Sequence, residues 1–152
     1  MKEKSAGRAL PVAKVFVRTD DGYLMVRKRA PGTEKDNRLE HLGGHIEEGE
    51  SPLEGMLREL REEETTGLLA SEMQRQHPSP LRFPLEGAED QLIFELRIDS
   101  ALARRLRADE AESYGLETVS AETLENDGKL RDFRDQLTPK TLAIYRAMGR
   151  IV

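Results

Sequence analysis

The segment from Ser51 to Glu63 constrains the fold of this chain more than any other. Ser51 and Glu54 have the spacing of a capping box, and Pro52 stands at the first helical position, so a helix is predicted to begin there. Four apolar residues then recur at the spacing of one helical face: Leu53, Met56, Leu57 and Leu60. An amphipathic helix of this kind packs its apolar face on a core, so the rest of the chain must supply a layer for it to cover.

The same helix concentrates three carboxylates on the flank beside its apolar face. At about 100° per residue, Glu59, Glu62 and Glu63 lie together on a helical wheel, and Gly55 lies on the same flank. Like charges at this spacing repel by roughly 0.2–0.5 kcal/mol per pair, whereas hard divalent cations such as Mg²⁺ bind carboxylate oxygens. Gly43-Gly44 before the helix, and Gly55 on it, leave room for a metal or a phosphate to come close. The pattern indicates a divalent-metal site, and from the helix alone a solvated acidic face is the alternative.

The composition limits the class of protein. The chain has 152 residues, which is enough for one domain with its own core. Its 24 Lys and Arg against 29 Asp and Glu give a net charge of −5, which argues against general nucleic-acid binding. The absence of Cys excludes disulfides, zinc–thiolate sites and thiol nucleophiles. No apolar run approaches about 18 residues, and no secretory signal is visible. We therefore expect a cytoplasmic protein without a membrane segment, with a flexible arm at 1–8 and a single domain at 9–152.

Strand and helix patterns alternate along the chain. The expected elements are, in order, strands at 9–18 and 23–29, a glycine-containing loop at 41–50, the helix from 52, two or three strands within 69–98, a helical turn at 100–108, a strand at 113–119 and a helix at 138–150. The turn signal Asp20-Asp21-Gly22 makes a hairpin of the first two strands. Thr138 is the expected N-cap of the last helix, with Pro139 at its first position. This alternation predicts a mixed sheet covered by helices.

The spacing around the acidic helix resembles the Nudix box of the Nudix hydrolases, a family that includes the MutT-like pyrophosphohydrolases. Six fixed positions of the box match without a gap: Gly44, Glu50, Arg58, Glu59, Glu62 and Glu63. Softer similarity extends over roughly residues 9–124. The resemblance implies an α+β fold, namely a Nudix-type α/β/α sandwich with a mixed central sheet and a loop-helix-loop catalytic segment.

The chain departs from the family pattern at two places. Glu64-Thr65-Thr66 stands where the box has one residue before its last glycine, which should lengthen the exit of the helix without moving the carboxylates. Pairing Glu63 with Glu64 instead is rejected, because Glu64 falls on the apolar side of the helical wheel. The segment Leu39–Leu42 has Leu, His and Leu where Trp, Leu and Pro are commoner, and the chain has no Trp for base stacking.

The resemblance also implies roles for the residues of the box. The expected metal ligands are Glu59, Glu62, Glu63 and the carbonyl of Gly43. Mg²⁺ is the expected ion, with Mn²⁺ as a substitute. Glu50 and Arg58 are expected to pair and to orient Glu59 rather than to bind substrate.

The catalytic base stays open between two glutamates. In MutT-like enzymes a further metal-binding or base glutamate lies eight residues before a serine that here is Ser120, which gives Glu112. Glu110 and Glu95 are rivals for that role, and Glu59 is the other candidate base. A carboxylate in this role would take the proton of the attacking water.

Three residues are candidates for contact with substrate phosphate. Arg27 and Arg29 alternate onto one face of the second strand, and His45 adjoins the glycine loop. A solvated strand end and an ordinary loop histidine are the alternatives.

The function that follows is Mg²⁺-dependent hydrolysis of the diphosphate linkage in a nucleoside diphosphate linked to another group, X. A non-catalytic Nudix domain that senses a nucleotide or binds RNA is the alternative. An isomerase acting on isoprenoid diphosphates is disfavoured, because that chemistry resembles one that uses a Cys. The expected partner is a nucleotide or nucleoside-diphosphate derivative. The particular nucleotide and the oligomeric state stay open, a homodimer included.

Overall fold

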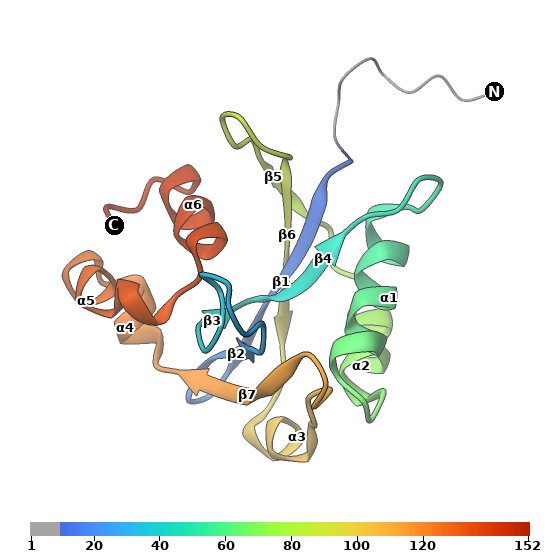
Figure 1. Ribbon diagram of the computed structural model, residues 1–152. Helices are drawn as coiled ribbons and strands as arrows, with labels where there is room; N and C mark the ends of the chain where they lie inside the picture. Colours follow the sequence, from blue (N-terminus) through green and yellow to red (C-terminus); the bar gives the residue numbers. More distant parts are fainter. Residues whose placement is uncertain (1–9) are drawn as a thin grey trace.

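The computed structural model describes residues 10–152, so the arm predicted at 1–8 lies outside the described residues (Figure 1). The strands are β1 (Val12–Thr19), β2 (Gly22–Lys28), β3 (Leu39–Glu40), β4 (Leu42–His45), β5 (Leu81–Phe83), β6 (Gln91–Arg97) and β7 (Ser113–Val119). The helices are α1 (Pro52–Glu63), α2 (Leu68–Gln76), α3 (Ser100–Arg105), α4 (Ala121–Glu125), α5 (Asp127–Phe133), the short 3-10 helix η1 (Arg134–Gln136) and α6 (Pro139–Ala147). Between residues 10 and 152, no helix has the length and apolar character needed to cross a membrane.

The strands form one mixed sheet, in which β1 shares one of its edges between two partners. On one side β1 pairs in parallel with β6, from Val12 to Arg18. On the other side it pairs in antiparallel fashion with β4 along Val12–Val15 and with β2 along Val17–Thr19. β3 and β7 pair with β2, and β5 pairs with β6. The sheet therefore splits where β4 and β2 part from each other, and the cleft described below lies at this split.

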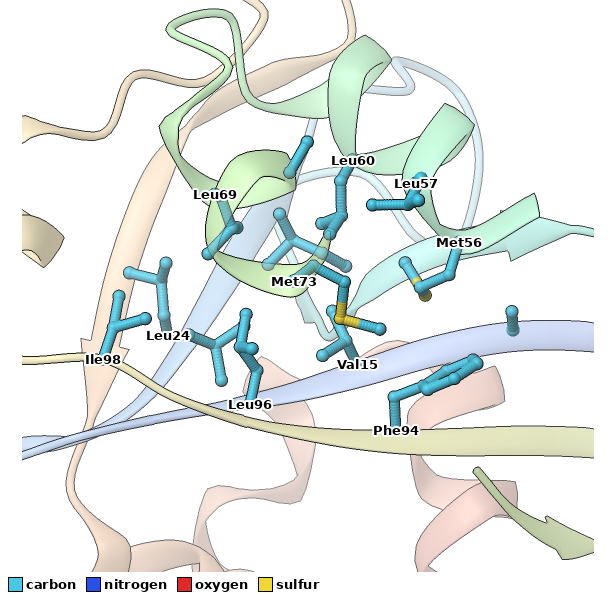
Figure 2. Close-up of a cluster of buried hydrophobic side chains, with 14 of the residues drawn as sticks. Val15, Leu24, Met56, Leu57, Leu60, Leu69, Met73, Phe94, Leu96 and Ile98 are labelled. Atoms are coloured by element: carbon cyan, nitrogen blue, oxygen red, sulfur yellow. The ribbon is translucent and has the colours of Figure 1, made fainter. Parts of the chain in front are cut away.

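Helices cover both faces of the sheet, as predicted for an α/β/α sandwich (Figure 1). Because side chains alternate along a strand, β1 supplies both cores. Ala13, Val15 and Val17 pack in the core with α1 and α2, whereas Phe16 packs in the core with α4, α5 and α6. Figure 2 shows the first core, where Met56 of α1 belongs to the same buried cluster as β1. This packing fixes which flank of α1 remains free for a site.

Of two predictions for the middle of the chain, one is wrong and the other is correct only in part. The segment 41–50, expected to be a loop, contains strand β4, because its glycines let the backbone pair closely with β1. Of the two or three strands predicted within 69–98, β5 and β6 are present, but the first part of this range is helix α2. Its buried residues are Leu69, Ala70 and Met73, a spacing that suits one helical face packed against α1.

Candidate active site

The start of α1 fixes the helix relative to the loop before it. The Glu54 backbone N–H donates to Ser51 Oγ at 3.1 Å, and the Ser51 N–H donates to Glu54 Oε1 at 2.8 Å. This completes the predicted capping box. Met56 and Leu60 are fully buried under the sheet, so the acidic flank of α1 lies beside the core instead of in it.

Gly43 and Gly44 bring the backbone of β4 against two carboxylates of α1. A Cβ on Gly43 would lie 2.0 Å from the carbonyl oxygen of Ala13. The Gly43 N–H donates to Glu63 Oε1 at 2.7 Å. A Cβ on Gly44 would lie 2.6 Å from the carboxylate carbon of Glu59. Glycine is needed at both positions because a side chain would displace β1 at one and Glu59 at the other.

Gly55 has a different role from the one that the helical wheel suggested. A Cβ there would lie 3.1 Å from Ile46 and 3.2 Å from Glu50 Oε1. The space that Gly55 leaves on the helix is therefore filled by the preceding loop and not by a ligand.

Arg58 joins Glu50 to Glu59. Its Nε and Nη2 donate to the two carboxylate oxygens of Glu50 at 2.8 and 3.0 Å. Its Nη1 donates to Glu59 Oε1 at 3.0 Å, and Nη2 also donates to the carbonyl of His45 at 2.8 Å. The two-point contact with Glu50 fixes the orientation of the guanidinium, and its Nη1 then holds one oxygen of Glu59 beside Gly44.

The three box carboxylates share a flank without meeting at one point. Glu62 is exposed, whereas Glu63 is partly buried and held by the Gly43 N–H. Burial raises the pKa of Glu63 to about 7, although Lys14 and Lys28 act against the rise. Among residues 10–152, no group of three His, Cys, Asp or Glu side chains lies close enough to hold a metal ion as the side chains stand.

Glu112 lies beside Glu63, although the two are far apart in the sequence. Both line a small cavity together with Lys28 and Asp109. The rivals lie elsewhere: Glu110 is exposed on the turn before Glu112, and Glu95 is exposed on β6.

The cleft at the split of the sheet has a volume of about 730 Å³ and is lined by Glu59, Arg58, Gly43, Gly44 and His45. His45 is 69% exposed, and its Nε2 lies 3.0 Å from Glu89 Oε1. Of the three predicted phosphate contacts, His45 alone lines this cleft.

Arg27 and Arg29 are engaged outside the cleft. Arg27 forms an ion pair with Glu117 of β7 and donates to the carbonyl of Asn37 at 2.8 Å. Arg29 donates to the carbonyl of Glu110 at 3.2 Å, and its guanidinium lies 5.3 Å from the centre of the Tyr114 ring. Strand alternation predicted that the two arginines share one face, but β2 ends at Lys28, and the two side chains contact β7 and the 110–114 turn and do not line the cleft.

A lysine-rich wall of the cleft was missed by the sequence interpretation. We define the basic wall as Lys14, Lys28, Lys35 and Lys140, all of which line the cleft. Lys14 interrupts the apolar run from Val12 to Val17, and this interruption was the signal that could have identified it.

Lys14 and Glu40 form a buried pair within the basic wall. Lys14 Nζ lies 3.3 Å from Glu40 Oε2 and also donates to the carbonyls of His41 and Gly43 at 3.2 and 3.4 Å. Thr138 donates its hydroxyl to Glu40 Oε1 at 3.1 Å. Burial alone would raise the pKa of Glu40, but Lys14, Lys28 and Thr138 together hold that pKa below its usual value. The carbonyl of Gly43, a predicted metal ligand, thus already has a weak contact with Lys14.

His41, next to Glu40, is buried in the second core. Its ring stacks on Phe16 with centroids 3.7 Å apart, and its Nε2 lies 2.6 Å from the hydroxyl of Tyr145. Burial lowers the pKa of His41 to about 3, so the ring is neutral at physiological pH.

Comparison with known proteins agrees with this fold. The family model of the NUDIX domain matches residues 8–141, and the chain belongs to this family. A segment of 56 residues is 36% identical to the 8-oxo-dGTP diphosphatase of Escherichia coli (strain K12). The match covers 37% of this chain and 43% of that protein, so it spans less than half of the curated relative.

Solved structures share the fold at low sequence identity. DR0079 from Deinococcus radiodurans is 18% identical, with a TM-score of 0.66 over 99% of this chain and 90% of that chain. A bifunctional NMN adenylyltransferase/ADP ribose pyrophosphatase from Francisella tularensis, complexed with AMP and a Mn ion, is 14% identical, with a TM-score of 0.63 over 96% of this chain and 42% of that chain. The NUDIX domain of Shewanella oneidensis NrtR, complexed with ADP ribose, is 13% identical, with a TM-score of 0.60 over 98% of this chain and 92% of that chain.

Proposed function

We propose that this protein hydrolyses a phosphoric anhydride bond in a nucleoside diphosphate linked to another group, with Mg²⁺ as the metal and Mn²⁺ as a substitute. The observation that carries the proposal is the Arg58 clamp, which holds Glu59 against Gly44 in a cleft that the lysines of the basic wall also line. The names of two similar proteins, a diphosphatase and a pyrophosphatase, agree with this chemistry.

The residues of the acidic flank fit a hard divalent cation. Gly44 has no side chain to fill the space at the Glu59 carboxylate, and the donors that would hold the ion are the oxygens of Glu59, Glu62, Glu63 and Gly43. A bound ion would neutralise the diphosphate and lower the pKa of a water molecule. Glu63, whose pKa burial raises, has one backbone hydrogen bond and would gain from a nearby positive charge.

The chain's own residues supply the remaining parts of the reaction. Lys28, Lys35 and Lys140 of the basic wall, with His45, would bind the phosphate oxygens and orient the substrate across the cleft. Glu112 would accept the proton of the attacking water. It lines the same small cavity as Glu63, one of the proposed metal ligands, and lies outside the helix that carries those ligands. Glu59 remains the other candidate base, although Arg58 already occupies one of its oxygens.

A panel of nucleotides at fixed Mg²⁺ tests this proposal, with product identity read by chromatography. The panel should include nucleoside triphosphates, an oxidised deoxynucleoside triphosphate, ADP-ribose, a nucleotide sugar and a dinucleoside polyphosphate. We expect hydrolysis of at least one of them, lost on chelation of the metal. No turnover of any member would contradict the proposal.

Two matched variants test the assignment of the base. Glu112→Gln should lower kcat by about 10²–10⁴-fold at saturating Mg²⁺, as expected for loss of a general base, while Glu110→Gln should leave it unchanged. If Glu59→Gln instead lowers kcat without weakening metal binding, and Glu112→Gln does not, Glu59 is the base.

Binding of a nucleotide without hydrolysis is a second candidate function. The NUDIX domain of NrtR, similar in fold, was crystallised with ADP ribose, which favours this possibility. Calorimetric binding of ADP-ribose with no product after prolonged incubation would support it over the first proposal.

A further inference from the structure

The carboxylate of Glu64, directly after the last glutamate of the box, is fully engaged with backbone and hydroxyl donors. The residue is 1% exposed. Its Oε1 accepts from the Thr66 hydroxyl at 2.8 Å and from the Leu69 N–H at 3.4 Å. Its Oε2 accepts from the Thr66 N–H at 3.1 Å and from the Arg107 N–H at 2.9 Å. One side chain therefore joins the end of α1, the start of α2 and the segment around Arg107.

The backbone reinforces this junction. The Thr65 N–H donates to the carbonyl of Arg107 at 2.9 Å, and the Asp109 N–H donates to the carbonyl of Glu63 at 3.0 Å. Glu64 and Ala108 form an isolated antiparallel bridge between these bonds. The segment 107–109 is thus attached to the end of α1 that carries Glu63.

The same segment leads within a few residues to Glu112, and the far side of that turn is held by Arg29. The Arg29 N–H donates to the carbonyl of Glu112 at 3.0 Å, and its guanidinium donates to the carbonyl of Glu110 at 3.2 Å. The turn that carries Glu112 is therefore fixed to α1 on one side and to the end of β2 on the other.

We propose that Glu64 is a positioning residue, which acts through the 107–109 segment to fix Glu112 beside Glu63. The inference rests on the proposed function, in which Glu112 takes part in hydrolysis. Glu64 and Thr66 belong to the stretch in which this chain is longer than the family's box pattern, so the longer helix exit has a structural purpose here.

Glu64→Gln is the direct test. Both carboxylate oxygens accept hydrogen bonds, so an amide would present its NH₂ group to at least one donor. We expect kcat to fall by about 10–10²-fold at saturating Mg²⁺, since small displacements of a reacting group have effects of that size, with KM and metal affinity little changed. Thr66→Val removes the hydroxyl, which donates to Glu64 and accepts from the Leu68 N–H, and should give a smaller loss in the same direction. Met73→Ala, in the buried core of α2, serves as the control for general destabilisation.

A double-mutant cycle separates positioning from a structural role. If Glu64 acts through Glu112, Glu64→Gln should slow the Glu112→Gln variant much less than it slows the wild type. Losses that multiply in full would overturn the inference, as would an equal loss of kcat in Met73→Ala.

Hydrogen exchange supplies a readout that does not depend on activity. The amides of Arg107 and Asp109 should exchange faster in Glu64→Gln than in a Met73→Ala sample brought to the same distance below its melting temperature. Equal exchange in the two variants would contradict the inference. Absence of wild-type turnover would count against the proposed function, whereas the exchange rates would still show whether Glu64 holds this segment.

Discussion

Two carboxylates, Glu40 and Glu63, lie near the same two lysines, yet their environments differ. Glu40 is 8% exposed, and it receives contacts from Lys14, Lys28 and the Thr138 hydroxyl, which together lower its pKa. Glu63 accepts one backbone hydrogen bond, and burial raises its pKa to about 7 in spite of the same lysines.

The difference shows that the protein compensates the charge of one of these buried carboxylates and not that of the other. The charge of Glu40 is compensated, since Lys14 and Lys28 of the basic wall both contact its carboxylate. The acidic flank of α1 has more negative charge than the protein neutralises, so it is the side that gains from an added cation. Four predictions, from the largest expected effect to the smallest, test this contrast.

The double variant Glu62→Gln/Glu63→Gln should remove the stabilisation that a bound metal gives at the acidic flank of α1. A metal that binds only the folded state stabilises it by about 2.7 kcal/mol at a concentration 100 times its Kd, and the variant should lose that increase in melting temperature. We also expect kcat to fall by about 10³-fold, in line with the several kcal/mol that a metal contributes. Glu48→Gln, at an exposed position, is the matched control. A metal-induced increase that survives in the double variant would place the ion elsewhere.

Lys14→Met should destabilise the fold by removing the Lys14–Glu40 ion pair. Removing one partner of a buried ion pair leaves an uncompensated charge, so the free energy of unfolding should fall by about 3 kcal/mol. Adding Glu40→Gln should restore part of the loss. Urea denaturation measures both values, with Lys35→Met at an exposed position as the control. A loss no larger than that of the control would show that the pair does not stabilise the fold.

Arg58→Lys should weaken metal binding at the acidic flank without removing the charges of its glutamates. Lysine cannot reproduce the two-point contact with Glu50 while also holding Glu59, so Mn²⁺ affinity should fall by about 10–100-fold, as for other partners that orient metal ligands. Paramagnetic resonance titration measures this change. Arg61→Lys, exposed on the same helix, should keep the wild-type affinity.

His41, next to Glu40 in the sequence, makes the stability of the fold depend on pH. Its pKa is about 3 in the folded protein and about 6.5 in an unfolded chain, so between these values only the unfolded chain binds the proton. Stability is therefore fully present above about pH 6.5 and is lost as the pH falls toward 3, by about 1.4 kcal/mol per unit. His41→Leu should remove this slope in denaturation curves at pH 7 and pH 5.5. His77→Asn, at an exposed position with positive φ, should keep the slope.

The parts of the site that local sequence controls were predicted, and the parts that depend on distant partners were not. The start of α1 is set by Ser51 and Glu54 within one turn, and the box spacing places Glu50, Arg58 and Glu59 together. Strand β4 could not be predicted, because its pairing depends on close approach to Ala13.

The basic wall depends on the topology of the whole sheet. Lys14, Glu40 and Thr138 come from three separate segments, and no spacing pattern relates them. The same reasoning explains Arg27, whose partner Glu117 belongs to a strand far along the chain. Alternation along β2 gives the face of such a residue, but the neighbouring strand decides what it contacts.

The parallel pairing of β1 with β6 has a consequence for the order in which the protein can be made. Val12 pairs with Gln91, so on the ribosome the glutamates of α1 emerge well before the strand that completes the sheet beneath them. Parallel strands so distant in sequence pair slowly, and until β6 is synthesised the backbone groups on this edge of β1 have no partner. Thr138, which completes the contacts of Glu40, emerges later still. We therefore expect the nascent chain to need protection from aggregation until synthesis is nearly finished, and cooler, slower expression to improve its yield.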